Sequence, residues 1–454
     1  MKILIFYFEN FNYLEKNAFN ILKKKNNELY FKKLHSSSKP TFSLKSFELY
    51  FYFIKKYFLR KKFFFINKTN ISNPDFIYVH RANKERLEIV KQYLKSHHIN
   101  STILFSDLET GSSKKSLIES IINKRHSIFL NIYSSHSGSF FLLQNLETPT
   151  SRLWVINYKK LINLSICYLD ELFIKSCNLV ERRKLDLSNI SDNSQLKLNV
   201  KNIKNYIFYL LGFFSQKNIK KEFDVFFYMK NRDPIKIKTY HKRHSADPFL
   251  INYNNIDYIF FEEIENQKGH ISLTKINKNS SEYLGKIIDE DFHLSFPFIF
   301  EDKGRYFMIP ESCNDKSLRL YESKDFPFQW KFKMKLIKDV DFADSIIIKS
   351  KEIYFILTSE RIEGYHNSYK IFYSKDLEST DWKPHKLNPI MINNYSRNAG
   401  MFIDKEKIIL VFQQYNFNDY GNNIRLFELN KLSTSTFGIE EINKGQYMNH
   451  ETEN

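Results

Sequence analysis

The stretch that decides the fold of the C-terminal half reads HLSFPFIFEDKGRYFMIPES and covers residues 293–312. It holds two apolar runs separated by a charged turn at Gly304. Polar residues stand at both outer ends, with His293 before the first run and Glu311 after the second. Two apolar runs joined by a short turn that contains glycine are typical of a β-hairpin. The stretch therefore predicts two antiparallel strands whose polar residues meet at one end.

Three other segments of the C-terminal half repeat this layout. Four residues occupy matching places in the first strands of the four repeats: Asp247, Pro297, Asp344 and Gly400. Their successive separations are 50, 47 and 56 residues. A repeat of about 40–50 residues with three or four strands is typical of a β-propeller blade. The sequence predicts an all-β five-bladed propeller, with four blades as the alternative. The fifth blade would combine 223–236 with 436–442.

The charge of the chain changes sign near residue 220. The 454 residues carry a net charge of +18. Residues 1–220 contain 36 Lys and Arg against 16 Asp and Glu, a net charge of +20, whereas 221–454 contain 33 against 35, a net charge of −2. Such a break indicates a domain boundary. We therefore predict a basic domain in 1–220 and the propeller in 221–454.

The basic domain alternates apolar runs with helical patterns. Strands are predicted at 3–8, 63–66, 76–79, 101–105 and 128–133. Helices are predicted at 84–94, 114–122 and 199–216. Alternating strands and helices predict an α/β domain with an open, mostly parallel sheet.

Several classes of protein are excluded by composition. The first glycine is Gly111, and no glycine-rich phosphate loop occurs before or after it. The cysteines Cys167, Cys177 and Cys313 form no CxxC pair, so neither a disulfide framework nor a zinc site is predicted. No cofactor and no metal site is evident, and no apolar stretch reaches the ~18 residues of a membrane span. We expect a cytoplasmic protein.

Residues 47–66 combine lysines with Phe and Tyr. The first interpretation is an amphipathic helix packed on its own domain with its lysines in water. The second is peripheral contact with an anionic membrane at the inner face, where rings enter the interface and lysines attract lipid charge. Nucleic-acid binding is the least favoured, because no RNA-recognition or helix-turn-helix signature accompanies the basic residues.

Polar residues recur at the same end of the predicted hairpins, so we expect them to converge in one site. Carboxylates and amides bind sugar hydroxyls, and glycosyl chemistry uses paired carboxylates as base and acid. The candidate catalytic residues are Asp247, Glu311 and Asp344. The candidate substrate-binding residues are Glu263, His293, Ser295, Arg397, Asn398 and Gln414. Each also has a structural explanation: turn formation for the two aspartates, capping for Glu311, packing for His293 and ion pairing for Arg397.

Two resemblances to known families follow from these motifs. Residues 131–141 and 147–154 resemble the sugar and methionyl-tRNA formyltransferase domain, although His136 is displaced from the Asn-x-His motif of that family. This implies a formyltransferase-like domain without formyl transfer activity. Residues 223–430, through the quoted stretch, Ala246-Asp247-Pro248 and Arg397-Asn398, resemble the N-terminal domain of glucosamine inositolphosphorylceramide transferases and bacterial relatives. That resemblance implies a propeller akin to arabinanase-type glycoside hydrolases.

The hydrolase pattern is not reproduced in order. The second blade begins with Ser295 and Phe296, where the resemblance implies an acid. The favoured function is therefore transfer of a sugar or sugar-like group to a glycan or glycolipid acceptor during surface polysaccharide or glycolipid biosynthesis, with a nucleotide sugar as candidate donor. Asp247 would be the general base, and Arg397 would hold a phosphate. The alternatives are a glycoside hydrolase and a non-catalytic glycan-binding or scaffold protein.

Overall fold

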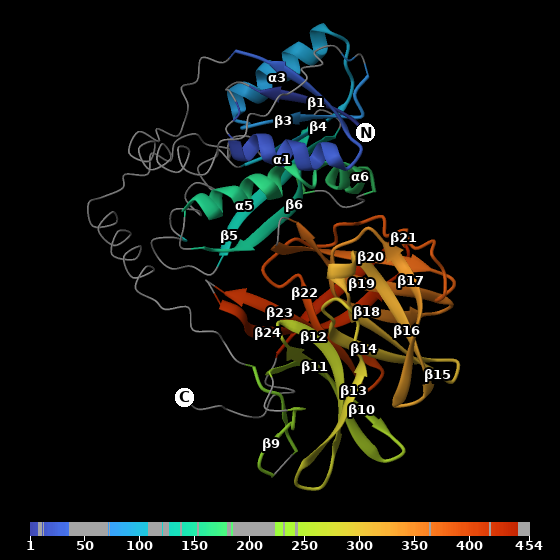
Figure 1. The fold of residues 1–454 in the computed structure, drawn as a ribbon. Helices are drawn as coiled ribbons and strands as arrows, with labels where there is room; N and C mark the ends of the chain where they lie inside the picture. Colours follow the sequence, from blue (N-terminus) through green and yellow to red (C-terminus); the bar gives the residue numbers. More distant parts are fainter. Residues whose placement is uncertain are drawn as a thin grey trace, which may run out of the picture. The chain divides into compact units, whose positions relative to one another are not determined.

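The computed structural model describes residues 1–7, 11, 13–35, 71, 73–107, 120, 127–136, 139–151, 154–178, 183–184, 223–229, 232–240, 244–362, 365–416 and 419–443. The chain divides into two compact units. The first contains 1–216 with 392–394 and 415–419, and the second contains the rest of the chain from 217 onward. Figure 1 traces both units in sequence order. No helix in the described part is long and apolar enough to cross a membrane.

The first unit is built on one seven-stranded sheet with the order β2-β1-β3-β4-β5-β6-β7. Its strands are β1 (Lys2–Tyr7), β2 (Glu28–Lys33), β3 (Phe76–Val79), β4 (Thr102–Ser106), β5 (Ser127–His136), β6 (Ser139–Pro149) and β7 (Arg183–Lys184). The pairs among β2, β1, β3 and β4 are parallel, and those from β4 onward are antiparallel. The predicted mostly parallel sheet is thus parallel in one half only, because the β5–β6 hairpin reverses the chain at its edge.

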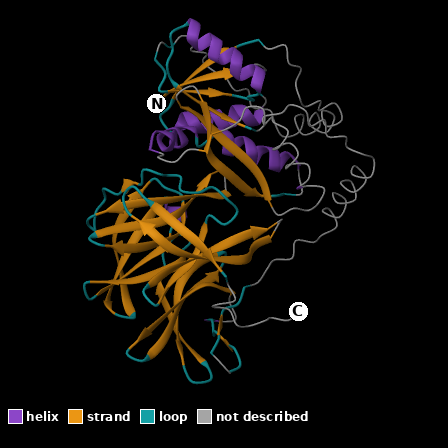
Figure 2. Ribbon diagram, turned by 180° about the vertical axis from the view of Figure 1, so that it is seen from behind, coloured by secondary structure: helices purple, strands orange, loops and turns teal. Residues whose placement is uncertain are grey.

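The described part of this unit contains four helices, and Figure 2 draws helices in purple. They are α1 (Tyr13–Lys24), α3 (Lys84–Ser96), α5 (Trp154–Ile166) and α6 (Leu169–Asn178). The α3 helix matches its prediction. Asn83 caps it by accepting the backbone N–H of Arg86 at 2.8 Å, and Leu87, Val90 and Leu94 are buried against the sheet. The predicted segments 47–66, 63–66 and 199–216 lie outside the described residues, as does all of 114–122 except Ser120. The formyltransferase-like arrangement stays a prediction.

The second unit is a propeller-like arrangement of four blades, each a four-stranded antiparallel sheet. The first two blades are β10 (His244–Tyr253), β11 (Ile256–Glu265), β12 (Lys268–Ile276), β13 (Ser281–Ile288), then β14 (Ser295–Asp302), β15 (Arg305–Glu311), β16 (Ser317–Asp325), β17 (Phe328–Lys338). A short 3-10 turn, η3 (Cys313–Asp315), precedes β16. The last two blades are β18 (Phe342–Ser350), β19 (Ile353–Ile362), β20 (Tyr365–Ser374), β21 (Lys383–Pro384), then β22 (Arg397–Asp404), β23 (Lys407–Asn416), β24 (Asp419–Leu432), β25 (Phe437–Ile442).

The prediction of five blades is wrong for the described structure. The C-terminal strand β25 pairs with β24 from Leu432↔Phe437 to Leu426↔Ile442, so it completes the fourth blade. The other half of the expected fifth blade is a separate two-stranded sheet of β8 (Phe226–Phe227) and β9 (Ile235–Lys236). Pairing of β25 with its immediate sequence neighbour needs no closure of a long loop, which favours this arrangement.

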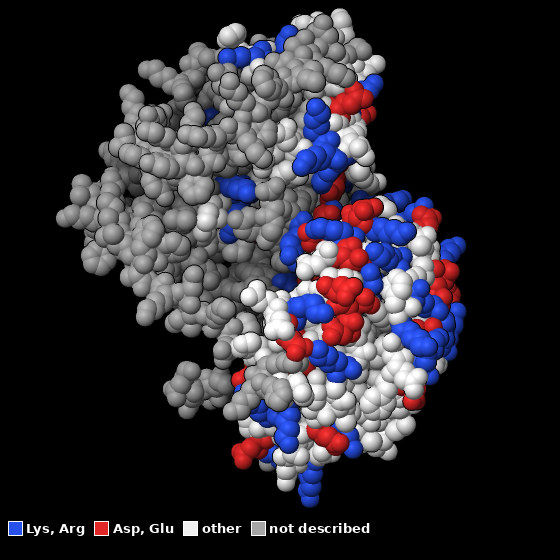
Figure 3. Space-filling model, in the orientation of Figure 1, with Lys and Arg blue, Asp and Glu red and all other residues white. Residues whose placement is uncertain are grey.

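Apolar residues of the blades form separate buried clusters in the second unit. Buried side chains of blades two, three and four share one cluster, and blade one packs with blade two in another. A Cβ placed on Gly400 of blade four would lie 3.9 Å from the ring of Phe249 in blade one. Both signs of charge are interspersed on the face of this unit that Figure 3 shows, which fits the near-zero net charge of its sequence.

Candidate functional site

The innermost strands of three blades share one unusual backbone conformation. Asp247, Phe296 and Asp344 have φ angles of 48°, 47° and 49°, each at a β-bulge. Positive φ is uncommon for residues other than glycine and is tolerated best by Asp and Asn. Recurrence at the same place in successive blades shows that the bulge belongs to the fold. In blade four, Asn398 follows Arg397 where the aspartates follow Ala246 and Ala343, and the bulge lies between Asn398 and Gly400.

The register across each bulge determines which polar residue of the second strand faces the aspartates. The residues that precede Asp247, Phe296, Asp344 and Asn398 each pair with a residue near the end of the second strand, giving four equivalent pairs: Ala246↔Glu262, Ser295↔Glu311, Ala343↔Ser359 and Arg397↔Gln413. Successive residues of a strand point to opposite faces. Glu262 and Gln413 are therefore the counterparts of Glu311, rather than Glu263 and Gln414, which were selected from the sequence.

Arg397 lies at the centre of a buried ion cluster. Its Nε donates to Asp344 Oδ2, its Nη2 lies 3.0 Å from Asp344 Oδ1, and the same nitrogen lies 3.4 Å from Glu311 Oε2. Asp344 is fully buried, and Glu311 and Arg397 are nearly so. Glu311 also accepts the backbone N–H of Asp344 at 3.3 Å. The structure thus joins Glu311, Asp344 and Arg397, three residues selected from the sequence.

The pKa of Asp344 depends on its burial and on these charged neighbours. Burial raises the pKa of Asp344 to about 7; Arg397 opposes this increase, and the neighbouring Glu311 carboxylate adds to it. Arg397 is fully engaged by two carboxylates, so its expected role of holding a phosphate has no support in this arrangement. Guanidinium forks bound on both sides act as internal counter-ions.

Asp247 is half-buried and faces the same cluster from blade one. Burial is the main cause that raises the pKa of Asp247 to about 7, followed by the negative charges of Asp344 and Glu262, while Arg397 and the backbone N–H of Phe296 act in the opposite direction. Among the described residues, no Lys, Arg or His nitrogen forms an ion pair with its carboxylate. A carboxyl group with a pKa near neutrality and no cationic partner is suited to accept a proton.

Glu262 and His293 form the third part of the cluster. His293 Nε2 lies 3.0 Å from Glu262 Oε1, and the backbone N–H of Gly269 donates to His293 Nδ1 at 2.9 Å. The hydrogen bond to Glu262 raises the pKa of His293, against the effect of burial. Because Nδ1 accepts the Gly269 N–H, a second proton on this ring would break that bond. In the neutral ring this geometry places the proton on Nε2, which donates to Glu262.

Gly269 has no room for a side chain beside this pair. A Cβ at this position would lie 2.5 Å from Leu294 O, 2.8 Å from Glu262 Oε1 and 2.8 Å from His293 Cε1. We expect Gly269→Ala to separate Glu262 from His293 and to lower the free energy of unfolding by about 1–3 kcal/mol. Urea unfolding and the imidazole NMR signals measure the two effects. Gly438→Ala, whose nearest contact would be the flexible Lys431 at 3.4 Å, is the matched control. Unchanged His293 signals in Gly269→Ala would contradict the prediction.

Glu263 points away from the cluster into blade one. Its Oε2 accepts His270 Nε2 at 3.0 Å, Ser272 Oγ at 2.8 Å and Tyr283 Oη at 2.8 Å, and its Oε1 accepts the backbone N–H of Tyr240 at 2.7 Å. Burial alone would raise the pKa of Glu263, but these hydrogen bonds outweigh it and hold the pKa at about 2. The structure therefore gives Glu263 a packing role inside blade one.

The low pKa of Glu263 predicts a pH-dependent contribution to stability. A carboxyl group whose folded pKa is depressed stabilises the fold above its unfolded pKa, and this contribution is lost as pH falls toward the folded pKa. We expect Glu263→Gln to lower the free energy of unfolding by about 3 kcal/mol at pH 7, and the difference from wild type to shrink by about half at pH 3. Urea unfolding at both pH values checks this. Glu282→Gln, an exposed glutamate of β13, is the control; a pH-independent effect of Glu263→Gln would refute the assignment.

The remaining selected residues have different positions. Asn398 is fully buried and structural: its amide donates to Asp344 O at 2.6 Å and Leu357 O at 3.1 Å, and its Oδ1 accepts Tyr369 Oη at 3.0 Å. Ser295 is buried opposite Glu311 in the ladder. Gln414 is half-buried and lies one residue past Gln413, the residue opposite Arg397.

Two residues near the cluster were not predicted as site residues from the sequence. Arg361 Nη2 lies 3.1 Å from Glu311 Oε1, and Cys313 Sγ donates to the same oxygen at 3.3 Å. Burial is the main cause that raises the pKa of the Cys313 thiol to about 12, so it is not a reactive thiolate. Arg361 lies near the end of β19, and no arginine at a matching place in another repeat marks it in the sequence. In the described part, no group of three or more His, Cys, Asp or Glu side chains is arranged to hold a metal ion.

Sequence comparison identifies relatives of the second unit. Residues 234–454 match the protein family described as "Glucosamine inositolphosphorylceramide transferase 1, N-terminal". The Glucosamine inositolphosphorylceramide transferase 1 of Arabidopsis thaliana is 35% identical over 209 residues, which cover 43% of this chain and 27% of that protein. The protein of the same name from Oryza sativa subsp. japonica is 30% identical over 219 residues, covering 44% and 29%. The chain thus spans less than a third of the length of these relatives.

Solved structures also align with part of the chain. A family 117 glycoside hydrolase from Zobellia galactanivorans, Zg3597, has a TM-score of 0.37 and 14% identity, covering 48% of this chain and 75% of its own. The α-L-arabinanase of Cellvibrio cellulosa complexed with arabinohexaose has a TM-score of 0.35 and 13% identity, covering 48% and 88%. By sequence, residues 234–454 are similar to the N-terminal part of glucosamine inositolphosphorylceramide transferases.

Proposed function

We propose that the propeller unit binds a sugar at the cluster of Asp247, Glu262 and His293, and that the chain transfers a sugar or sugar-like group from an activated donor to a glycolipid or glycan acceptor. The observation that carries this proposal is the carboxylate of Asp247, which faces other acids and forms no ion pair within the described part of the chain. The relatives of residues 234–454 support the reaction class, because their name combines a sugar, a ceramide lipid and a transferase. Surface polysaccharide or glycolipid biosynthesis is the proposed setting.

Each group of the cluster has a distinct role in this proposal. Asp247 accepts the proton of the acceptor hydroxyl, since its pKa of about 7 matches the pH at which a base works best. Glu262, positioned by its hydrogen bond with His293, hydrogen-bonds a hydroxyl of the sugar. Asp344 and Glu311 hold Arg397, whose charge lies beside Asp247 and balances the negative charge of the site. A nucleotide sugar is the proposed donor.

The arrangement disfavours a glycoside hydrolase. Hydrolysis of a glycoside uses two carboxyl groups that flank the bond, one protonated as the acid and the other as base or nucleophile. Asp344 and Glu311 both bind the guanidinium of Arg397, so neither carboxyl group is placed to flank a glycosidic bond. The carboxylate of Asp247 favours a second candidate, a glycan-binding function without turnover. One carboxylate that forms no ion pair among the described residues suffices to bind hydroxyls.

Donor turnover and ligand binding separate these candidates. Purified full-length protein is incubated with a panel of nucleotide sugars, with and without ceramide glycolipid acceptors, while released nucleotide and the melting temperature are recorded. Nucleotide release that depends on the acceptor supports sugar transfer. A higher melting temperature with free glycans and no turnover with any donor supports the binding function. No response to donors, acceptors or glycans would refute both.

A further inference from the structure

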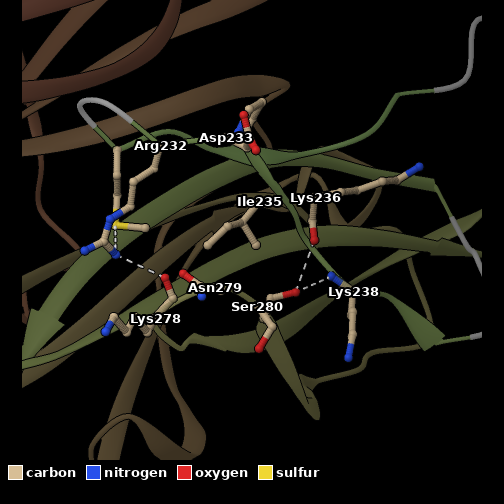
Figure 4. A pocket seen from close by; sticks show the side chains of 11 residues that line it. Arg232, Asp233, Ile235, Lys236, Lys238, Lys278, Asn279 and Ser280 are labelled. Atoms are coloured by element: carbon tan, nitrogen blue, oxygen red, sulfur yellow. Dashed lines mark hydrogen bonds between the residues drawn. The ribbon is translucent and has the colours of Figure 1, made fainter.

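A second polar region of the propeller unit lies away from the acidic cluster. It is a groove of about 1020 Å³ between the β8–β9 hairpin and the turn that joins β12 to β13. Figure 4 shows its lining, with Arg232 and Lys238 from the hairpin segment and Lys278 from the turn. Neither the predicted function nor the similarity to known proteins assigns a ligand to it.

The β8–β9 hairpin attaches to blade one through alternate residues. Val225 and Ile237 are buried in one cluster with Ile259 and Phe261, and the backbone N–H of Ile237 donates to Val225 O at 2.9 Å. The hairpin is therefore anchored by one of its faces. Because side chains of a strand alternate between faces, the intervening residues must point outward.

The outward face of the hairpin exposes large aromatic side chains. Phe223, Phe226 and Tyr228 are 45%, 43% and 62% exposed. Single exposed apolar residues are normal on protein surfaces, but three rings within six residues form a patch. Phe and Tyr with one apolar face in contact with water are typical of segments that enter a membrane interface.

The groove beside these rings is strongly basic. Arg232, Lys236, Lys238 and Lys278 line it, and Asp233 is the acidic residue among its lining residues. Lys236 pairs with Asp224 at 2.6 Å. Within the described ranges, the charged ends of Arg232, Lys238 and Lys278 form no ion pair, and Arg232 donates instead to Lys278 O at 3.1 Å. These three cations are free to bind an anion.

We propose that the β8–β9 hairpin docks the propeller on an anionic phospholipid surface, with lipid phosphates in the basic groove and the rings of Phe226 and Tyr228 in the interface. Each Lys or Arg close to an anionic bilayer raises membrane affinity about fivefold. Three such cations therefore account for about a 100-fold preference for anionic over neutral vesicles. The docking surface is distinct from residues 47–66, which lie outside the described residues.

The arrangement favours lipid over nucleic acid. Single-stranded nucleic acids bind along extended basic tracks that follow several successive phosphates, with site sizes of about 4–16 nucleotides. Here Figure 4 shows Arg232 and Lys278 toward one end of the groove and Lys238 toward the other, so the three cations line one groove and do not extend into a longer track. Cations in a single groove next to exposed rings match lipid phosphates above an acyl layer.

The test measures vesicle binding by the full-length protein. Sedimentation with vesicles of phosphatidylcholine and phosphatidylserine in about a 3:1 ratio is compared with phosphatidylcholine alone. The charge variant Arg232→Gln/Lys238→Gln/Lys278→Gln is expected to bind the anionic vesicles about 100-fold more weakly than wild type. The matched control, Lys331→Gln/Lys338→Gln/Lys375→Gln, removes three exposed lysines from blades two and three and is expected to bind like wild type.

A second pair of variants tests the rings. Phe226→Ser/Tyr228→Ser is expected to weaken binding at least 10-fold even at high salt, where lysine contacts are screened. Phe328→Ser, which removes a ring that is 39% exposed in blade two, is its control. Circular dichroism and melting temperature confirm folding of every variant. Wild-type protein that ignores anionic vesicles, or charge variants that bind them like wild type, would overturn the proposal. If the charge variant lost binding to a single-stranded oligonucleotide but kept its binding to vesicles, the proposal would also be overturned and the groove assigned to nucleic acid.

Discussion

Asp247→Asn is expected to lower kcat/KM for sugar transfer about 1,000-fold and to leave the fold intact. Asparagine keeps the size of the side chain and tolerates the positive φ of this position, so the bulge is preserved. It removes the proton acceptor, because an amide oxygen is not basic at neutral pH. It also removes a negative charge beside Glu262 and Asp344, so the free energy of unfolding at pH 8 should be unchanged or higher.

The pH profile gives an independent measure of the same role. Asp247 must be ionised to accept a proton, and its pKa is about 7. The wild-type kcat/KM should therefore rise with pH and level off above about pH 7, and the residual activity of Asp247→Asn should lack this rise. A residue with a purely structural role would change the level of activity without removing the rise.

Asp339→Asn is the matched control for this substitution. Asp339 also has a positive φ, of 59°, but it is exposed in the turn after β17. The same chemical change at the same backbone conformation should leave kcat/KM and its pH profile at wild-type values. Equal activity of Asp247→Asn and wild type would eliminate Asp247 as the base, whatever the outcome of the donor panel.

The largest effect on stability is expected from Arg397→Met. Removing one member of a buried ion cluster leaves uncompensated charge, which destabilises proteins by about 3–5 kcal/mol. Here the carboxylates of Asp344 and Glu311 would lose their shared counter-ion. Methionine fills a similar volume, so the loss reflects charge more than packing. Urea unfolding followed by Trp330 and Trp382 in a Trp154→Phe background reports on the propeller.

The sign of the pH dependence follows from the raised pKa of Asp344. An acid with a folded pKa above its unfolded value of about 3.9 destabilises the fold when ionised, and this effect is relieved as pH falls through the folded pKa. Without Arg397 the pKa of Asp344 rises further above about 7. The destabilisation by Arg397→Met should therefore be greater at pH 8 than at pH 5.

A double variant separates charge from packing. Asp344→Asn together with Arg397→Met removes both members of the closest pair, and we expect it to be more stable than Arg397→Met alone by about 2 kcal/mol at pH 8. Arg305→Met, which removes a partly exposed arginine between Glu322 and Glu378, should change stability by less than about 1 kcal/mol. If Arg305→Met and Arg397→Met were equally destabilising, the buried cluster would have no special importance.

Local patterns in the sequence were sufficient for most strands and for the residue types of the site. The β14–β15 hairpin was predicted from residues 293–312, and α3 from the spacing of Leu87, Val90 and Leu94. Asp247 and Asp344 were noted at matching places in their repeats, and the structure places both at β-bulges. These features depend on residues close together in the chain, whose periodicity of two or 3.6 reports directly on which face is buried.

Local patterns could not show which of two adjacent polar residues in a second strand faces the site. Glu262 and Glu263 are adjacent, and Glu263 was the predicted site residue, although the ladder opposite Ala246 turns Glu262 toward His293. The same holds for Gln413 and Gln414 opposite Arg397. A bulge shifts the register by one residue, and a shift of one residue exchanges the two faces of a strand. No local pattern in the sequence shows which residue of such an adjacent pair faces the site.

By itself, the sequence determined that the second half is built of repeated antiparallel hairpins carrying acids at one end, because apolar alternation and turn residues act over a few positions. The tertiary structure alone decided three things: that β25 closes the fourth blade instead of a fifth, that Arg397 serves Asp344 and Glu311 as a counter-ion, and that Asp247 forms no ion pair with any described residue. Each depends on contacts between residues far apart in the chain, and the energy of such contacts is set by burial and by the charges that the fold brings together.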